Sequence, residues 1–278
     1  MAIKYADNEK SKLTEINSLF KSWKNEVSTS RVKRNNGRYS SGKDLFSEDG
    51  FFPNYFNHRP KVLFMGREDT KCHNTIKEWI KIFENDSIPV SNNFFSTLLY
   101  LLYGINNGFP EYWENVPEAS VIAQSIGKPG KNGLSFSFME LSKYGNNNGS
   151  DRCDKKLIEQ FLEHSNLEKR KYFKEEFSIL EPDIIITQNL WGISKTISNY
   201  IDECIFNDDL ECYAIKYDEY ANLFCITINK KKIPVIDMSH FSRKTNKDIE
   251  TKFYKPLNKV IKSDGFKKNF PKIKILNF

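Results

Sequence analysis

The chain has 278 residues, of which 39% are hydrophobic and 28% charged, with a formal net charge of +6. This composition is typical of a globular protein, and no apolar run approaches the roughly 20 residues of a membrane-spanning helix, so we expect no membrane association. The positive charge favours a polyanionic partner. Much of it lies in residues 21–38 and 259–274, which are either solvated lysine-rich surfaces or phosphate-binding segments.

The five cysteines are odd in number and include no CxxC pair, which argues against a disulfide framework and a compact zinc site. We expect them to be reduced and mostly buried. The first residues, MAIKYADNEKSK, contain neither an apolar signal core nor a small-residue cleavage site. These features predict a cytoplasmic protein.

Apolar residues recur at helical spacing in residues 13–23 and predict an N-terminal helix. Residues 31–53 contain Asn-Gly, Ser-Gly and Asp-Gly pairs and are typical of a loop. We therefore expect an N-terminal helical and basic extension over residues 1–52, followed by one α/β domain over residues 53–278.

Four apolar runs bounded by polar or breaker residues predict buried strands at residues 61–65, 134–141, 183–187 and 233–237. Helical patterns occupy residues 74–84, 94–103, 154–180 (one or two helices), 193–202 and 247–263. This alternation predicts a three-layer α/β/α fold with a mostly parallel central sheet of about four strands. Two further β-rich segments, residues 211–217 and 223–228, predict a hairpin or paired edge strands.

In such sheets ligands bind outside the carboxyl ends of the strands. The loop after the first predicted strand reads GREDTKCHN and gathers Arg67, Glu68, Asp69 and His73 behind Gly66. These polar groups either form a site or, for Glu68 and Asp69, cap the helix that begins near residue 74 or 75.

The other predicted strands add further candidates. Alternation along FSFMELSK places Glu140 on the face of two phenylalanines, where it either lies at the binding edge or pairs with a cation such as Lys143. His240 follows the last strand and is either a site residue or a structural histidine. Phe94 and Phe95 begin a helix that is mostly core, and one of them could stack on a base.

In this order the segments resemble the uracil-DNA glycosylase superfamily over residues 60–261. KVLFMGRED is similar to the family's first strand and water-activating loop, with Gly66 and Glu68 at the matching positions. NNFFSTLLYLLYG is similar to a helix start of the mismatch-specific branch, with Phe94 or Phe95 as the stacking aromatic. FSFMELSK resembles the central strand that ends in the base-reading residue, here Glu140.

Two later segments extend the resemblance. ILEPDIIITQN is similar to the strand after the long helix and ends at Gln188 and Asn189. IPVIDMSHFSR resembles the final strand and its histidine–proline–serine loop, with His240 and Ser242 matching and Phe241 in the proline's place.

The resemblance implies a monomeric, metal-independent DNA glycosylase without a cofactor, which flips a damaged or modified base and hydrolyses its glycosidic bond in repair or defence. The implied roles are as follows: catalysis by Glu68, His240 and Asp69; substrate binding by Gly66, Arg67, Phe94, Phe95, Glu140 and Asn189; DNA binding by Ser242, Arg243, Lys244 and Lys143.

Two residues depart from the family pattern. Glu68 replaces the usual aspartate or asparagine that holds the water, and Glu140 replaces the usual base-reading asparagine. An ionised carboxylate only accepts hydrogen bonds, so we expect Glu140 to repel a carbonyl and to favour an amino-bearing base such as a cytosine derivative rather than uracil.

Two alternatives belong to other functional classes. One is a non-catalytic DNA-binding module on the same fold. The other is a metal-dependent nuclease or hydrolase in which Glu68, Asp69 and His73 hold a divalent ion. Release of free base, binding without release, and sensitivity to a chelator distinguish the three.

Overall fold

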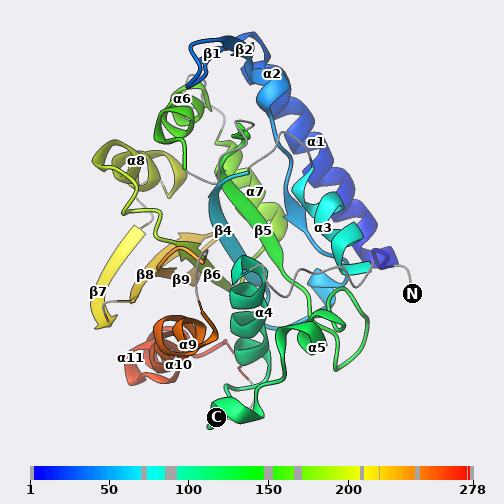
Figure 1. Cartoon of the computed structure of the whole chain (residues 1–278), viewed down its shortest axis with the longest axis vertical. Helices are drawn as coiled ribbons and strands as arrows, with labels where there is room; N and C mark the ends of the chain where they lie inside the picture. Colours follow the sequence, from blue (N-terminus) through cyan, green and yellow to red (C-terminus); the bar gives the residue numbers. More distant parts are fainter. Residues whose placement is uncertain are drawn as a thin grey trace.

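The computed structural model describes residues 3–69, 74–84, 93–146, 153–165, 171–206, 210–218, 220–241, 245–273 and 275, with only the backbone for residues 204 and 210–218 (Figure 1). Its centre is a mixed β-sheet with helices packed against it. Within the described residues, no helix is long and apolar enough to cross a bilayer.

The main sheet contains seven strands: β3 (Gly50–Phe51), β4 (Val62–Glu68), β5 (Ser137–Ser142), β6 (Ile184–Gln188), β7 (Leu210–Asp218), β8 (Ala221–Ile228) and β9 (Lys231–Met238). They lie in the order β3-β5-β4-β6-β9-β8-β7. The four central strands, β5, β4, β6 and β9, are parallel, and the pairings of β3, β8 and β7 are antiparallel. A separate two-stranded hairpin is formed by β1 (Arg31–Lys33) and β2 (Tyr39–Ser41).

The parallel strands are apolar on both faces because helices cover both. Along β4, Val62 and Phe64 belong to one buried cluster, whereas Leu63 and Met65 belong to another. The same alternation holds in β5, where Phe138 lies on the face of Phe64 and the neighbouring methionine on the opposite face. We call these the Phe64 face and the Met65 face.

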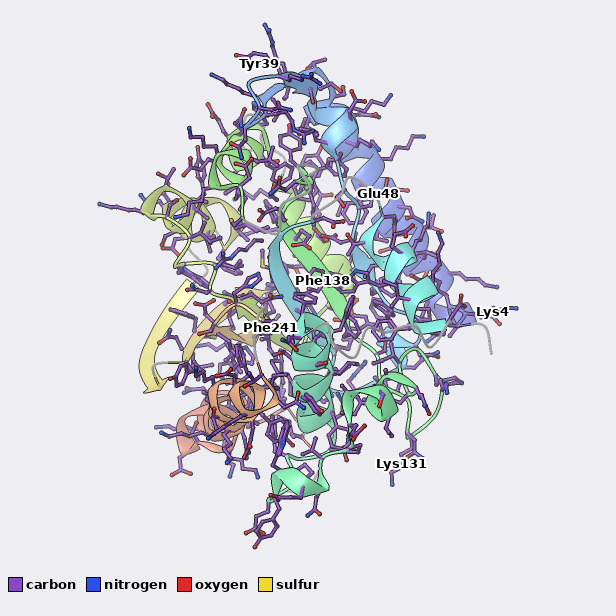
Figure 2. The ribbon with its side chains drawn as sticks, in the orientation of Figure 1. Lys4, Tyr39, Glu48, Lys131, Phe138 and Phe241 are labelled. Carbon is purple, nitrogen blue, oxygen red and sulfur yellow. The ribbon has the colours of Figure 1, made fainter. Side chains whose placement is uncertain are left out.

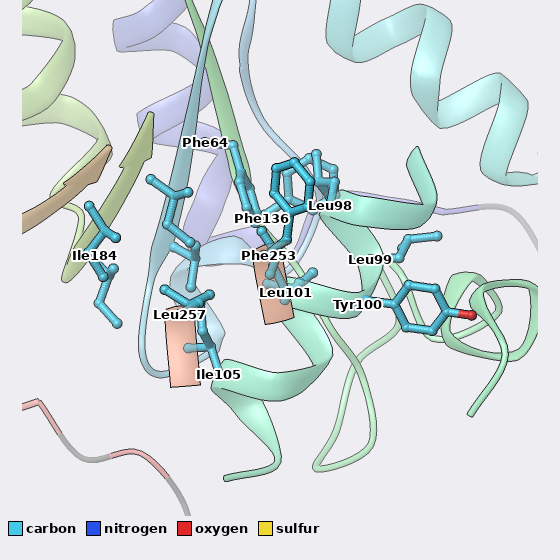
Figure 3. Close-up of a cluster of buried hydrophobic side chains, with 14 of the residues drawn as sticks. Phe64, Leu98, Leu99, Tyr100, Leu101, Ile105, Phe136, Ile184, Phe253 and Leu257 are labelled. Carbon is cyan, nitrogen blue, oxygen red and sulfur yellow. The ribbon is translucent and has the colours of Figure 1, made fainter. Parts of the chain in front are cut away.

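The Phe64 face is covered by α3 (Thr75–Glu84), α4 (Asn93–Asn106), α5 (Ala119–Ala123), α9 (Asn246–Ile249), α10 (Lys255–Lys262) and α11 (Asp264–Asn269), with a π-helical segment at Glu250–Tyr254. Figure 3 shows Leu98 and Leu101 of α4 near Phe64 of β4 and near Phe136, which precedes β5. The sequence of α4 is mostly apolar, and nearly all of its residues are buried.

The Met65 face is covered by α1 (Lys10–Glu26), α2 (Gly42–Leu45), α6 (Lys155–Ser165), α7 (Tyr172–Leu180) and α8 (Lys195–Tyr200), with a π-helical segment at Ile201–Ile205. Trp23 of α1 is fully buried and stacks on Tyr172 of α7, with ring centroids 4.9 Å apart. In Figure 1, α4 lies on the near side of β4 and β5, and α7 is seen behind them.

The four predicted strands are the four parallel strands, and the predicted hairpin is β7 and β8. The predicted count of about four strands is too low because β3, β7 and β8 extend the sheet on both sides. The 154–180 region contains two helices, α6 and α7.

Residues 31–53 were expected to be a loop, but they form β1, β2, α2 and β3. The Asn-Gly pair supplies the β1–β2 turn, where Gly37 has φ +78°. The boundary at residue 52 stays a prediction, although α1 and β3 contribute side chains to the core of the Met65 face.

Candidate functional site

The candidate site lies at the carboxyl ends of the parallel strands, where three of them bring side chains into one row on the Phe64 face. Gly66 of β4 is the register partner of Glu140 in β5. On the other side of β4, Met65 pairs with Thr187 of β6, so the next pair in this register is Gly66 and Gln188. The row is therefore Glu140, Gly66, Gln188.

Glycine at position 66 is required by the close approach of Glu140. A Cβ atom added at Gly66 would lie 2.6 Å from Glu140 Oε2 and 2.9 Å from Phe138 Cζ. The Glu140 carboxyl group consequently leans over β4, in the direction of β6. Any side chain at position 66 would displace it.

Glu140 is buried and its Oε2 atom has no hydrogen-bond partner among the described residues. Burial raises its pKa well above the ordinary value, and the nearby carboxylates of Asp69, Asp49 and Glu68 raise it further. A raised pKa favours the protonated form of Glu140, which can donate as well as accept a hydrogen bond. The expected repulsion of a base carbonyl assumed an ionised carboxylate, and it stays a prediction.

Glu68, at the end of β4, is half-buried and accepts a hydrogen bond from the Asp154 backbone N–H at 2.7 Å. Burial raises its pKa to about 7, and hydrogen bonds from the Asp154 backbone and the Cys153 thiol offset part of the rise. An acid with this pKa exchanges its proton near neutral pH, as a general base must.

Asp69 is hydrogen-bonded to the first residue of α3. Its Oδ2 atom accepts hydrogen bonds from the hydroxyl groups of Thr75, at 2.8 Å, and Ser47, at 3.1 Å. The cap of α3 is Asn74, whose side-chain oxygen accepts from the Lys77 backbone N–H at 2.8 Å. The helix cap expected of Glu68 or Asp69 is thus supplied by Asn74, while Asp69 is bonded to the Thr75 side chain, and its catalytic role stays a prediction.

The two phenylalanines at the start of α4 occupy different surroundings. Phe95 is buried in the core beside Trp79 and Phe83. Phe94 is half-buried, with ring centroids 6.0 Å from Phe138 and 6.1 Å from Phe241. Phe94 is therefore the better placed of the two to stack on a ligand at the strand ends.

The loop after β9 begins with half-buried His240 and fully buried Phe241. Phe241 packs against Phe64 and Phe253. Figure 2 places Phe241 and Phe138 near the centre of the molecule, beside the upper end of α4. This packing holds Phe241, the residue after His240, on the Phe64 face. Ser242, Arg243 and Lys244 lie outside the described residues.

Lys143 lies elsewhere in the molecule, on the Met65 face. It has no exposed surface, and its Nζ atom lies 2.5 Å from Asp49 Oδ2 and 3.1 Å from Glu176 Oε2. Desolvation by burial lowers its pKa, but the two carboxyl groups outweigh that effect and raise it. Lys143 is thus a buried cation held by structural partners, and we leave it out of the proposed DNA-binding surface.

Arg67 and Asn189 border the Met65 face. Asp237 of β9 is buried, has its pKa raised to about 6 by burial, and accepts a hydrogen bond from Thr187. The charge of Arg67 lowers that pKa in part, so the two side chains are near one another. The Asn189 side chain folds back against Gly192, where an added Cβ would lie 2.2 Å from Asn189 Oδ1.

The basic β1–β2 hairpin docks next to Glu68. Asn35 Nδ2, in its turn, donates to Asp154 Oδ2 at 2.6 Å, and Asp154 is the residue whose backbone holds Glu68. Lys33 of the hairpin also exchanges two backbone hydrogen bonds with the side chain of Gln160 in α6. Sequence reasoning did not connect this basic run with the site, because the contacts join residues more than 100 positions apart.

Gln188 was also missed as a site residue. It is fully buried, yet neither Oε1 nor Nε2 has a hydrogen-bond partner among the described residues. Alternation along β6 gives the signal, because Ile184 and Ile186 belong to the Phe64 face and Gln188 follows in the same phase.

Within the described residues, no group of three or more His, Cys, Asp and Glu side chains is arranged to hold a metal ion. His73 lies outside the described residues, so this finding does not test the predicted metal site of Glu68, Asp69 and His73.

Comparisons with family models, curated proteins and solved structures found no match to this chain. The likeness to uracil-DNA glycosylases therefore rests on the sequence segments alone.

Proposed function

We propose that the protein is a DNA glycosylase that flips a nucleotide out of DNA and hydrolyses the bond between its base and sugar. The observation that carries the proposal is the meeting of three groups at one sheet edge. Glu68 exchanges a proton near neutral pH, Glu140 offers a buried polar atom, and Phe94 offers an aromatic face. The proposal includes the three-layer α/β/α arrangement, which the separate clusters on the two sheet faces support.

In this proposal Phe94 stacks on the flipped base and Glu140 binds its edge. Stacking on an aromatic side chain contributes roughly 1–3 kcal/mol per base and tolerates different bases. Glu140 Oε2 and Phe138 Cζ both lie against Gly66, at 2.6 and 2.9 Å from the position of an added Cβ atom. A base that donates to or accepts from Oε2 would satisfy an atom that is otherwise buried and unpaired.

Glu68 orients the attacking water and takes its proton as the glycosidic bond breaks. The Asp154 backbone N–H holds Oε1 of the carboxylate in place. His240 stabilises the negative charge that develops on the departing base by donating a hydrogen bond to it.

The phosphates would be held by the β1–β2 hairpin, whose Lys33 and Arg38 side chains are exposed. Arg31 lies over the ring of the half-exposed Tyr39, with its Cζ atom 3.9 Å from the centroid. The Asn35–Asp154–Glu68 chain of hydrogen bonds places this surface beside the proposed catalytic acid. Positive and aromatic groups together suit a nucleic-acid backbone with unstacked bases.

The test is a mass-spectrometric search for free bases released by the full chain from unmodified, deaminated and hypermodified DNA, each with and without EDTA. We expect release of at least one base that EDTA does not reduce. Tight binding without release would indicate the non-catalytic module. Strand cleavage that EDTA abolishes would indicate the metal-dependent nuclease.

A further inference from the structure

The strongest unexplained feature outside the proposed catalytic groups is the side chain of Gln188. An amide has two donors and an acceptor, and burying it without partners destabilises a protein. Gln188 has no exposed surface, and neither its Oε1 nor its Nε2 atom has a hydrogen-bond partner among the described residues. Such a group marks a place where a ligand can bind.

The position of Gln188 is set by the sheet. Glu140 and Gln188 flank Gly66 on either side in the same row, so their Cα atoms are separated by two strand spacings, about 10 Å. Because the Glu140 side chain leans over Gly66, its carboxyl group lies closer to β6 than its Cα atom does. The unpaired polar atoms of both side chains therefore lie in one row on the same face of the sheet.

The residues beneath the row are apolar. Phe138, Phe64 and Ile186 form the preceding row on the same face, and Phe94 packs against Phe138. A heterocycle bound at the strand ends therefore meets hydrocarbon along its plane and polar groups only along one edge. The polar groups at that edge are the Gln188 amide, which both donates and accepts, and the Glu140 carboxyl group.

We infer that Gln188 is a second base-reading side chain, which together with Glu140 binds the carbonyl-bearing edge of a nucleobase across Gly66. The inference rests on the proposed function and names its substrate class. A base carbonyl accepts from the Gln188 amide, and a neighbouring ring N–H or amino group donates to Glu140 Oε2. Uracil and cytosine have such an edge, whereas adenine has no carbonyl.

The experiment measures calorimetric binding of free uracil, cytosine and adenine to the full chain and to Gln188→Met, which keeps the length of the side chain but removes its hydrogen-bonding groups. We expect uracil and cytosine to bind at least tenfold more tightly than adenine. Gln188→Met should weaken both pyrimidines about tenfold or more. Met238→Leu, the apolar neighbour of Gln188 in the register, is the matched control and should stay within twofold.

The stability of the variant separates ligand binding from a structural role. Because the amide has no described protein partner, Gln188→Met should unfold at the same temperature as the wild type or higher. A drop of more than a few degrees would mean that the amide holds the fold together, and it would overturn the inference. So would unchanged pyrimidine binding in the variant, equal binding of adenine, or no binding of any of the three bases at millimolar concentration.

Base release from DNA is scored separately. A chain that binds pyrimidines through Gln188 but releases no base keeps this inference and contradicts the glycosylase. If Gln188→Met releases base at the wild-type rate, the glycosylase proposal stands and this inference is contradicted.

Discussion

At the scale of single residues, Glu68 and Glu140 show how position changes the chemistry of the same side chain. Burial and three nearby carboxylates raise the pKa of Glu140 well above its ordinary value, whereas Glu68 is less buried, accepts a hydrogen bond from one backbone N–H, and has a pKa raised to about 7. The surroundings of the two acids therefore favour the protonated form of Glu140 and allow Glu68 to exchange its proton near neutral pH.

The pKa of Glu68 predicts a pH profile. Only the ionised form accepts a proton from water, so the single-turnover rate of base release should rise about tenfold per pH unit below pH 7 and level off above it. His240→Asn should lower the rate but keep this acid limb. A rate that stays constant between pH 5.5 and 8.5 would show that Glu68 is not the base.

Lys143 gives a stability prediction. Replacing it with methionine would leave Asp49 and Glu176 buried without their cation, so Lys143→Met should lower the free energy of unfolding by about 3–5 kcal/mol in urea titrations. Lys43→Met, at an exposed position, should change it by less than about 0.5 kcal/mol. An equally stable Lys143→Met protein with weakened DNA binding would instead support a phosphate contact.

At the scale of elements, the β1–β2 hairpin and the C-terminal basic run are the two candidates for the phosphate-binding surface. The hairpin is joined to Glu68 through Asp154, and no such link is seen for the described part of the C-terminal run. The double variant Lys33→Gln/Arg38→Gln should therefore weaken DNA binding and reduce the slope of log K against log salt by about 2.

The matched control for the hairpin is Lys268→Gln/Lys272→Gln, which removes the same charge from exposed positions of the C-terminal run. It should leave the salt slope nearly unchanged. If the control lowers the slope and the hairpin variant does not, DNA binds on the other surface.

Elements also differ in how far the sequence predicts them. The long apolar runs predict β4, β5, β6 and β9 because hydrophobic periodicity is a local property. Strand β3 is two residues long and exists only through its pairing with β5. The hairpin turn was visible as an Asn-Gly pair, but no flanking alternation marked β1 and β2 as strands.

At the scale of the whole molecule, buried acids make stability depend on pH. Burial raises the pKa of Glu68 to about 7 and that of Asp237 to about 6, so the folded chain keeps these protons while the unfolded chain loses them near pH 4. The folded state thus binds more protons, and these groups lower the free energy of unfolding as pH rises from about 4 to 7.

Glu68→Gln and Asp237→Asn isolate that effect. Each keeps a side-chain oxygen for the hydrogen bonds that Glu68 and Asp237 accept from backbone N–H groups. Relative to wild type, Glu68→Gln should gain up to about 3 kcal/mol between pH 4.5 and 8, measured by urea unfolding at a series of pH values. A difference that is constant with pH would mean that the pKa of Glu68 is not raised in the folded state.

The candidate site is less predictable than the fold because its contacts span the chain. Glu140 was found from strand alternation, but its protonation depends partly on Asp49, which accepts a hydrogen bond from the Glu140 backbone N–H across 91 positions. Lys143 looked available for DNA because nothing local shows that Glu176 lies beside it. Long-range packing decides which polar residues face a ligand.

The most direct measurement compares wild type with Glu68→Gln on whichever DNA yields a released base, scoring base release and DNA binding on the same samples at pH 8. The account predicts that the variant binds this DNA within about threefold of wild type and releases base at least a hundredfold more slowly. A variant that releases base at the wild-type rate would contradict it.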